Sequence, residues 1–408
     1  MIDRRALLAA LVTMALIAAR PAVAVERAPL PVPRPGSTAP VEDAAELQAR
    51  LGPSGVSAWL LVDIDTGDRL SAKLPERAMA PASVAKLATA LYALDRLGTE
   101  HRFVTRLHAR GPVRGGVLEG DLLLEGGGDP ELDSDDIAGL VRRTARAGFE
   151  RVAGRFLVDA GPAPFVEAID PEQPVDAAYN PALSGLNLNF NRVRLSWGPE
   201  IGPEGLAVTA LSDESNPPVA RVRVLADDAL GVPAAHEVGA DGETWRLPAR
   251  ALGGQGSRWL PVRRPALYAA EVFREIAAAR GIEMPEPRPG HLRDDARIIA
   301  RAFSRPLGEM LGDMLRYSTN LSAEVLGLAA SRAGGARPRS LADSAEAMNL
   351  WIARELGRRL PGPQVAFANH SGLSAASRVA PADLVELLLR VTRRPARPLA
   401  RHPRLPGP

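Results

Sequence analysis

The sequence predicts an α/β protein that carries a large, mostly β insert. Helical patterns dominate the outer segments of the 408-residue chain, whereas short apolar strands punctuated by Gly and Pro dominate its middle. A strand pattern at Arg297–Phe303 lies among the later helices, so the outer segments mix both element types. We therefore assign residues 41–101 and 260–390 to one α/β body and residues 102–259 to the insert.

The first part of the body contains the pattern that places Ser83. Leucines recur at helical spacing between Val84 and Leu97, and Gly98 ends the pattern, so Ser83 is expected at the start of a helix. The other elements expected here are a short helix at Val41–Leu51 and two strands, Ala58–Ile64 and Arg69–Ser71, joined by the turn Asp65-Thr66-Gly67.

The insert and the second part of the body differ in the period of their apolar residues. The strands expected in the insert are Val117–Glu125, Arg151–Val158, Leu186–Trp197 and Val219–Leu225, interrupted by one helix at Asp135–Gly148. The later helices are expected at Ala266–Arg280, Leu307–Arg316, Ala323–Arg332, Leu341–Leu356 and Ala382–Leu389.

The N-terminus has the pattern of an export signal. Two arginines precede the apolar run Ala6–Ala19, and Ala22-Val23-Ala24 offers the small side chains that a signal peptidase accepts, so residues 1–24 are expected to be a signal peptide cut after Ala24. An ordinary secretory route and a twin-arginine route both stay open. A periplasmic protein is expected, with a Pro-rich linker at residues 25–40 and a disordered Arg/Pro tail at residues 391–408.

Composition excludes several kinds of chemistry. The chain has no cysteine, which excludes thiolate nucleophiles and Cys-ligated zinc, and its formal charge of +2 gives no reason to expect a nucleic-acid partner. Gly126-Gly127-Gly128-Asp129-Pro130 lacks the Lys-Ser/Thr ending of a phosphate-binding loop, and His236-Glu237 lacks a second histidine at helical spacing. We expect neither a metal nor an organic cofactor.

Ser83 and Lys86 form the first candidate catalytic pair. Their spacing of three residues at the start of a helix puts a hydroxyl and an amine on one face, about one turn apart. A serine becomes nucleophilic when a base takes its proton, and a lysine can be that base if burial lowers its pKa. The alternative is an N-cap serine followed by a solvated lysine, which this short motif does not exclude by itself.

Ser318-Thr319-Asn320 forms a second candidate element between two predicted helices. A loop at this position can present the hydroxyl of Ser318 and the amide of Asn320, although the same residue types also cap helices. A catalytic pair of His370 with Ser371 is the weaker hypothesis, because adjacent side chains rarely point at each other.

These motifs resemble those of the D-alanyl-D-alanine carboxypeptidase and endopeptidase family, the class C low-molecular-mass penicillin-binding proteins. Pro81 to Leu91 is similar to the family's S-x-x-K helix, and Ser318-Thr319-Asn320 is similar to its Ser-x-Asn turn, with Thr at a position that is usually Asp. Three further resembling segments are Gly126 to Pro130, Tyr179 to Asn191 and Ser371 to Ser374. The resemblance implies a penicillin-binding/β-lactamase-like (DD-peptidase) body that holds the insert between its first and second motifs.

The resemblance also implies a reaction. Ser83 would attack the carbonyl between two D-alanines of a peptidoglycan stem peptide, Lys86 would be the base, Ser318 would relay protons and Asn320 would bind the peptide. β-Lactams would acylate Ser83. Two alternatives stay open: a catalytically dead relative that only binds peptidoglycan, and a β-lactamase, which the long insert disfavours.

The third motif of the family, Lys-Thr-Gly, is absent from the sequence. Only Lys73 and Lys86 are lysines, and neither precedes Thr-Gly. In the family this motif lies on a strand that holds the substrate carboxylate and supplies an oxyanion donor, whose loss alone costs about a hundredfold or more in rate. We therefore expect a chain truncated before this strand, with an exposed sheet edge and reduced activity.

Overall fold

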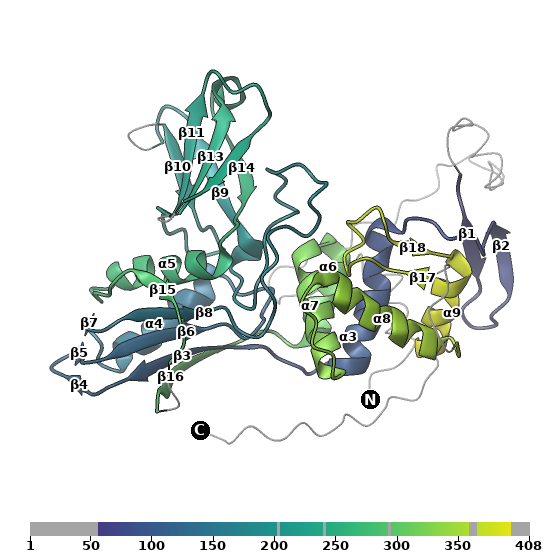
Figure 1. Cartoon of the computed structure of the whole chain (residues 1–408), viewed down its shortest axis with the longest axis horizontal. Coiled ribbons are helices and arrows are strands. Elements are labelled where there is room, and N and C mark those ends of the chain that lie inside the picture. The colour runs from purple at the N-terminus through teal and green to yellow at the C-terminus, as the bar shows by residue number, and fades with distance from the viewer. Residues whose placement is uncertain (1–55, 202–204, 240–241, 293–294, 359–364, 393–408) are drawn as a thin grey trace, which may run out of the picture.

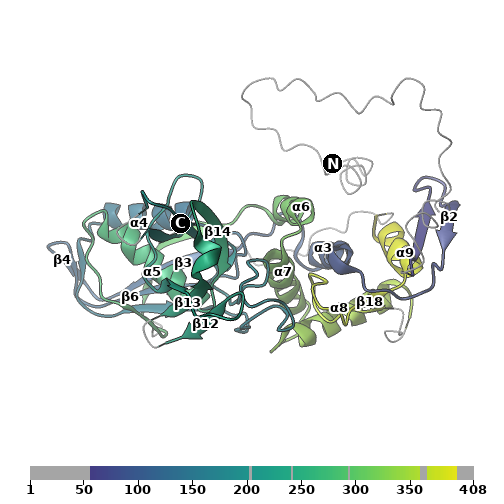
Figure 2. The ribbon, with the colours of Figure 1, turned by 90° about the horizontal axis from the view of Figure 1, so that it is seen from above.

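The computed structural model describes residues 56–201, 205–239, 242–292, 295–358 and 365–392, which form two parts lying side by side (Figures 1 and 2). One part is a bundle of helices, the helical body, and the other is built mainly of strands. The signal peptide, the linker and the helix at Val41–Leu51, all predicted from the sequence, lie outside the described residues, as does the predicted tail beyond residue 392.

The helical body is packed around α3. Its helices are α3 (Ala85–Leu97), α6 (Leu307–Tyr317), α7 (Asn320–Ala333), α8 (Leu341–Glu355) and α9 (Pro381–Thr392). Helix α3 contacts the other four. It does so through small side chains, since Ala85, Ala88 and Ala93 are fully buried, which lets the neighbouring backbones approach closely.

A hairpin lies at the outer end of the helical body. Strands β1 (Trp59–Val62) and β2 (Arg69–Lys73) pair antiparallel and pack on α9, while β17 (Val365–Ala366) pairs with β18 (Arg378–Val379). Among the described residues, β1 and β2 pair only with each other.

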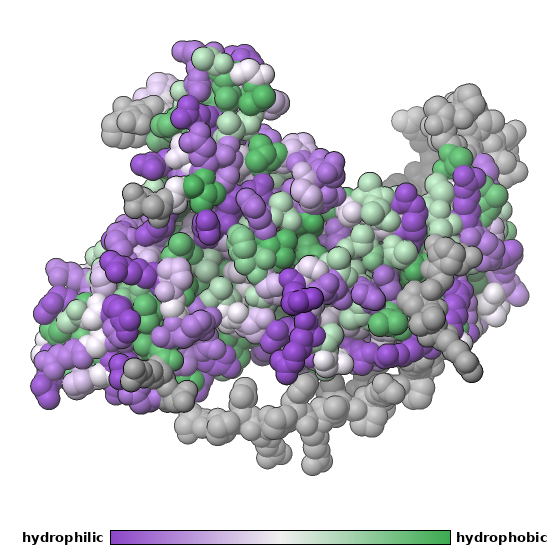
Figure 3. Space-filling model, viewed as in Figure 1, coloured by the Kyte–Doolittle hydropathy of each residue, from purple (hydrophilic) through white to green (hydrophobic). Residues whose placement is uncertain are grey.

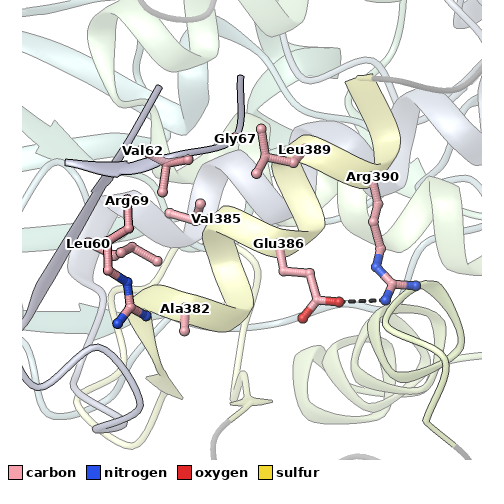
Figure 4. A pocket seen from close by; sticks show the side chains of 9 residues that line it. All are labelled: Leu60, Val62, Gly67, Arg69, Ala382, Val385, Glu386, Leu389 and Arg390. Carbon is pink, nitrogen blue, oxygen red and sulfur yellow. Dashed lines mark ion pairs between the residues drawn. The ribbon is translucent and has the colours of Figure 1, made fainter. Parts of the chain in front are cut away.

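Figure 4 shows the cavity between the hairpin and α9, where Leu60, Val62 and Val385 face one another. No residue lining it is a serine or a lysine, so the catalytic candidates lie elsewhere.

The other part is organised around a five-stranded sheet with the order β15-β8-β6-β3-β16. The residue bounds are β3 (Val104–Arg110), β6 (Asp121–Glu125), β8 (Phe156–Asp159), β15 (Pro287–Pro289) and β16 (Arg297–Phe303). Helices α4 (Ser134–Arg146) and α5 (Pro265–Ala278) pack together beside it. A small sheet of β4 (Val113–Arg114), β5 (Val117–Leu118) and β7 (Arg151–Val152) adjoins its outer end.

Two three-stranded sheets project from this part, at the top of Figure 1. One has the order β10-β9-β14 and the other β11-β13-β12. Their strands are β9 (Arg192–Trp197), β10 (Leu206–Thr209), β11 (Val222–Asp227), β12 (Ala235–Val238), β13 (Glu243–Pro248) and β14 (Gly256–Pro261).

In the described part of the chain, no helix is both long and apolar enough to cross a bilayer.

The boundary predicted at residue 260 is wrong. Strand β16 pairs with β3 over the length of the insert sheet, β15 pairs with β8, and α5 shares a hydrophobic core with the insert strands. The helical body has a separate core that begins again at Leu307. The insert therefore extends to about residue 304, because the strand at Arg297–Phe303 completes the edge of its sheet rather than that of the body.

The strand predicted at Leu186–Trp197 begins only at Arg192. Asn189, Phe190 and Asn191 all have left-handed backbone conformations, which end any strand before them. The asparagine side chains compensate, since Asn189 accepts a hydrogen bond from the backbone of Ser134 and Asn191 accepts one from Leu188. This segment is a hydrogen-bonded loop that ties the insert together.

Two glycine segments that the sequence singled out interlock. The N–H of Gly128 donates to the carbonyl of Gly185 at 2.7 Å, and a Cβ at Gly185 would lie 2.2 Å from the carbonyl oxygen of Ala160. The backbones of the two segments pass too close to each other for a side chain to fit at these glycines. Close packing therefore accounts for the glycines in both segments, and no ligand is needed to explain them.

Gly185→Ala is expected to destabilise the protein by about 1–3 kcal/mol, because the added methyl group must displace backbone. Gly231 has nothing within 4 Å of an added Cβ, so Gly231→Ala is the matched control and should change stability by less than about 0.5 kcal/mol. Urea denaturation of both variants measures the difference. Equal stabilities would contradict the close approach.

Candidate active site

Ser83 lies in a tight turn directly before α3. Residues Ala82–Val84 form one turn of 3-10 helix, and Ala82 has the left-handed φ of 45° that few non-glycine residues adopt. The side chain of Ser83 is exposed at the mouth of the helix. The turn thus offers its hydroxyl to a molecule arriving from solvent.

Lys86 is the buried partner of Ser83. It lies one turn further along α3, only 1% exposed, with its Nζ 3.2 Å from the Oγ of Ser83. Nζ also donates to Asn320 Oδ1 at 2.8 Å and to the carbonyl oxygen of Ser371 at 2.9 Å. Every hydrogen that the amine can offer therefore has an acceptor, as a buried amine requires.

Burial sets the charge state of Lys86. Desolvation lowers the pKa of Lys86 to about 8, and the negative charge of Glu324 acts in the opposite direction. A neutral amine can donate to Asn320 and Ser371 and still use its lone pair to accept the hydroxyl proton of Ser83. The geometry therefore suits a general base near neutral pH.

Ser318 approaches Ser83 from the opposite side. It caps α6 in a left-handed conformation, with φ of 56°, and this bend aims its hydroxyl at Ser83. Its Oγ lies 2.7 Å from that of Ser83. The exposed hydroxyl of Ser83 thus lies between an amine and a second hydroxyl, which can pass a proton in either direction.

Asn320 connects the helical body with the insert. It is the first residue of α7, and while its Oδ1 accepts from Lys86, its Nδ2 donates to the backbone carbonyl of Tyr179 at 3.0 Å. Apolar side chains gather over the surface where the two parts meet (Figure 3). All four residues predicted from sequence, Ser83, Lys86, Ser318 and Asn320, therefore lie together, although Ser83 and Ser318 are 235 residues apart in the sequence.

The turn at residues 369–372 forms the floor of the site. Gly372 has φ of 73°, and a Cβ there would lie 1.9 Å from the carbonyl oxygen of Ala82, so this turn packs directly on the turn that holds Ser83. The carbonyl of His370 accepts from Thr89 on α3 at 2.7 Å, and the N–H of Gly372 donates to Asn369 at 3.0 Å. The close contact between Gly372 and Ala82 explains why the Ser-Gly-Leu-Ser segment has a glycine at this position.

Glu324 lies behind the site on α7 and was not among the candidates from sequence. It is completely buried, and its two oxygens accept from the N–H groups of His370 and Ser371 at 3.0 and 2.8 Å. Burial raises the pKa of Glu324, and hydrogen bonds from Ser371 and His370 oppose that shift. Its position four residues after Asn320, hence on the same helix face, was the available signal.

The hypothesis of a His370–Ser371 catalytic pair is not supported by the geometry. The ring of His370 is fully buried, stacks on Tyr92 and hydrogen-bonds through Nε2 to Ser344 at 2.8 Å. Its role is to fill the core under the turn. Among the described residues, no cluster of three or more histidine, aspartate or glutamate side chains could hold a metal ion.

The fold and the site together define the class of penicillin-binding serine proteins, in which the serine and the lysine share one helix. The chain belongs to the D-Ala-D-Ala carboxypeptidase 3 (S13) family, whose pattern matches residues 41–400. The resemblance stated from the sequence, and the α/β fold class that it implied, are thereby confirmed.

Individual relatives agree with this assignment. A D-alanyl-D-alanine carboxypeptidase of Actinomadura sp. (strain R39) is 29% identical over 288 residues, which are 66% of this chain and 53% of the relative. The chain thus spans about half the length of this curated relative. Penicillin-binding protein 4 of Haemophilus influenzae has the same fold, with a TM-score of 0.65 and 21% identity over 83% of this chain and 76% of that one. A complex of the same protein with a β-lactam gives a TM-score of 0.66 at 20% identity, over 85% of this chain and 76% of that one.

His370 should make the protein sensitive to acid. Burial lowers the pKa of His370 to about 3, against 6.5 for an exposed histidine, so below pH 6.5 only the unfolded chain takes up the proton. Stability is therefore complete above pH 6.5 and is lost progressively as the pH falls toward 3.

Between pH 7 and pH 5 this residue should cost the wild type about 2 kcal/mol of stability. In His370→Gln, which retains a side-chain hydrogen-bonding group for Ser344, that part of the loss should vanish. Urea denaturation at both pH values measures it. An identical pH dependence in the two proteins would show that the ring is not held neutral.

Proposed function

We propose that the protein is a serine-type D-alanyl-D-alanine carboxypeptidase and endopeptidase that acts on peptidoglycan stem peptides through an acyl-enzyme on Ser83. The observation that carries the proposal is the position of the Ser83 hydroxyl between the buried amine of Lys86 and the hydroxyl of Ser318, at 3.2 and 2.7 Å. An exposed nucleophile beside a desolvated base is what acyl transfer requires.

The first half of the reaction forms an ester. Ser83 Oγ attacks the carbonyl carbon between the two D-alanines while its proton moves to the neutral amine of Lys86. The tetrahedral intermediate then loses the amine of the terminal D-alanine, which takes up a proton that Ser318 can relay from Lys86. The short contact between the two hydroxyls supports this relay.

The second half returns the enzyme to its starting state. Water attacks the ester carbonyl, Lys86 takes the proton of the water, and Ser83 leaves with a proton that returns to its oxygen. Asn320 would hold the peptide, because its amide lies beside both Lys86 and the insert. In this proposal the chain's own side chains carry every proton transfer.

The relatives support the substrate class. The Actinomadura protein carries the name of a D-alanyl-D-alanine carboxypeptidase, and the Haemophilus protein is known in complex with a β-lactam. We infer that peptides ending in D-Ala-D-Ala are the substrates of this chain and that β-lactams acylate it.

One sequence fact favours a second candidate function. The only lysines are Lys73 and Lys86, so no Lys-Thr-Gly motif occurs within the 408 residues. A relative that binds peptidoglycan without turnover is therefore the alternative, and a β-lactamase is the third candidate. These three functions differ in what happens to penicillin and to D-alanine.

We further propose a periplasmic location, with export through the N-terminal signal. The support is the sequence alone: paired arginines, an apolar run and the small residues before Ala24.

Incubation with a labelled penicillin, followed by intact-mass measurement, tests the enzymatic proposal. The wild type should gain one penicillin per chain and Ser83→Ala should gain none, because the ester needs the serine oxygen. Ser57→Ala, which changes a serine outside the site, is the control and should be labelled like the wild type. An unlabelled wild type that is folded would favour the binding protein.

The same samples separate the remaining candidates. Release of D-alanine from a D-Ala-D-Ala peptide, with slow loss of the penicillin adduct, is the result expected for a DD-peptidase. Rapid hydrolysis of penicillin without D-alanine release would instead identify a β-lactamase.

N-terminal sequencing of the protein recovered from the periplasm of an expressing Gram-negative host tests the location. The mature chain should begin at Val25, since cleavage is expected after Ala24. Ala24→Phe should block processing, because the signal peptidase accepts only small residues there. An unprocessed cytosolic wild type would refute the location.

A further inference from the structure

Glu324 is a buried acid that the reaction itself does not use. It belongs to the middle of α7, among apolar neighbours such as Val325 and Leu328, and none of its surface reaches solvent. A buried carboxylate costs free energy unless it is hydrogen-bonded or paired with a charge. The partners of Glu324 therefore indicate what it does.

Those partners form one short turn. The two carboxylate oxygens bind the consecutive N–H groups of His370 and Ser371, and the same turn presents the carbonyl of Ser371 to Lys86 at 2.9 Å. Thr89 holds the intervening carbonyl of His370 from α3. The peptide unit between residues 370 and 371 is thus fixed at both its ends.

The charges around Lys86 make Glu324 distinctive. The amine of Lys86 hydrogen-bonds to Ser83, to Asn320 and to the carbonyl of Ser371, and Glu324 on α7 acts on it through its charge. His370 is neutral there because burial lowers its pKa, and the hydroxyls and the amide carry no charge. Glu324 is the anion that acts on Lys86, and it counters the effect of burial.

We propose that Glu324 is a positioning residue that anchors the turn at residues 370–371 and so keeps the amine of Lys86 aimed at Ser83, while its negative charge serves as the counter-charge to that amine. This inference rests on the proposed acyl transfer for its kinetic consequence only. Its structural part concerns Lys86 alone and can be measured without any turnover.

The exchange Glu324→Gln tests both parts. Its amide nitrogen would face a backbone N–H, donor against donor, so one anchor of the turn is lost together with the charge. Acylation by penicillin should become at least about tenfold slower, because small displacements of a catalytic group carry large rate costs. Glu324→Asp keeps the charge but is too short to reach both N–H groups, so it should slow acylation while the titration of Lys86 changes less.

The second readout follows Lys86 itself. Only Lys73 and Lys86 are lysines, so ¹³C-labelled lysine gives one NMR signal from each side chain, with Lys73 as an internal standard. In the wild type the signal of Lys86 should titrate with a pKa of about 8. In Glu324→Gln the pKa should fall, because the charge that stabilises the ammonium is gone, and the signal of Lys73 should stay unchanged.

Glu271 provides a matched control. It is also a buried glutamate on a helix, α5, whose carboxylate accepts from two consecutive N–H groups, those of Ala220 and Arg221, but it lies in the insert. Both bonds use Oε1 alone, so Glu271→Gln removes a buried carboxylate but can keep both of them. It should leave the acylation rate and the titration of Lys86 as in the wild type.

The outcomes separate the two proposals. A wild type that takes no penicillin, combined with a shifted Lys86 titration in Glu324→Gln, would refute the function and support the role of Glu324. If a folded Glu324→Gln, as judged by circular dichroism, keeps the wild-type titration and acylation rate, Glu324 has no such role. Equal losses of acylation in Glu271→Gln and Glu324→Gln would show a general loss of stability instead.

Discussion

The burial of one amine organises this molecule. Lys86 is placed in the core of the helical body, and a lysine there is tolerated only where every hydrogen it offers finds an acceptor. Asn320 supplies one acceptor from α7, and Ser371 supplies another from a turn near the end of the described chain. Segments far apart in sequence are therefore held at fixed positions around α3, and the small residues of α3 make room for them.

The same arrangement leaves Ser83 at the border between core and solvent. Its hydroxyl contacts the buried amine on one side and the exposed Ser318 on the other. Burial lowers the pKa of Lys86 far enough for it to act as a base, and the cost of that burial is offset by hydrogen bonds and by the charge of Glu324. Stability and reactivity at this site thus have one physical origin.

The insert contributes to the site through backbone atoms. Tyr179 offers its carbonyl to Asn320 in the site, and Pro162 offers its carbonyl to Arg332 at the other end of α7. Sequence patterns could not reveal these contacts, because any residue has a carbonyl. The edge strand at Arg297–Phe303 was located correctly but assigned to the wrong sheet. Alternation of side chains shows that a strand exists, but it does not show which strand is its partner.

Patterns in the sequence were enough to predict the local features of the site. The helix after Ser83, the i to i+3 spacing of Lys86 and the break between two helices at Ser318 all follow from periodicity, caps and breakers acting over a few residues. The packing of the folded chain brings these elements together, buries Lys86 instead of leaving it solvated, and places Glu324 and the turn at residues 370–371 where they support it. Burial and long-range hydrogen bonds depend on what packs against a residue, and a linear pattern carries no record of its distant neighbours.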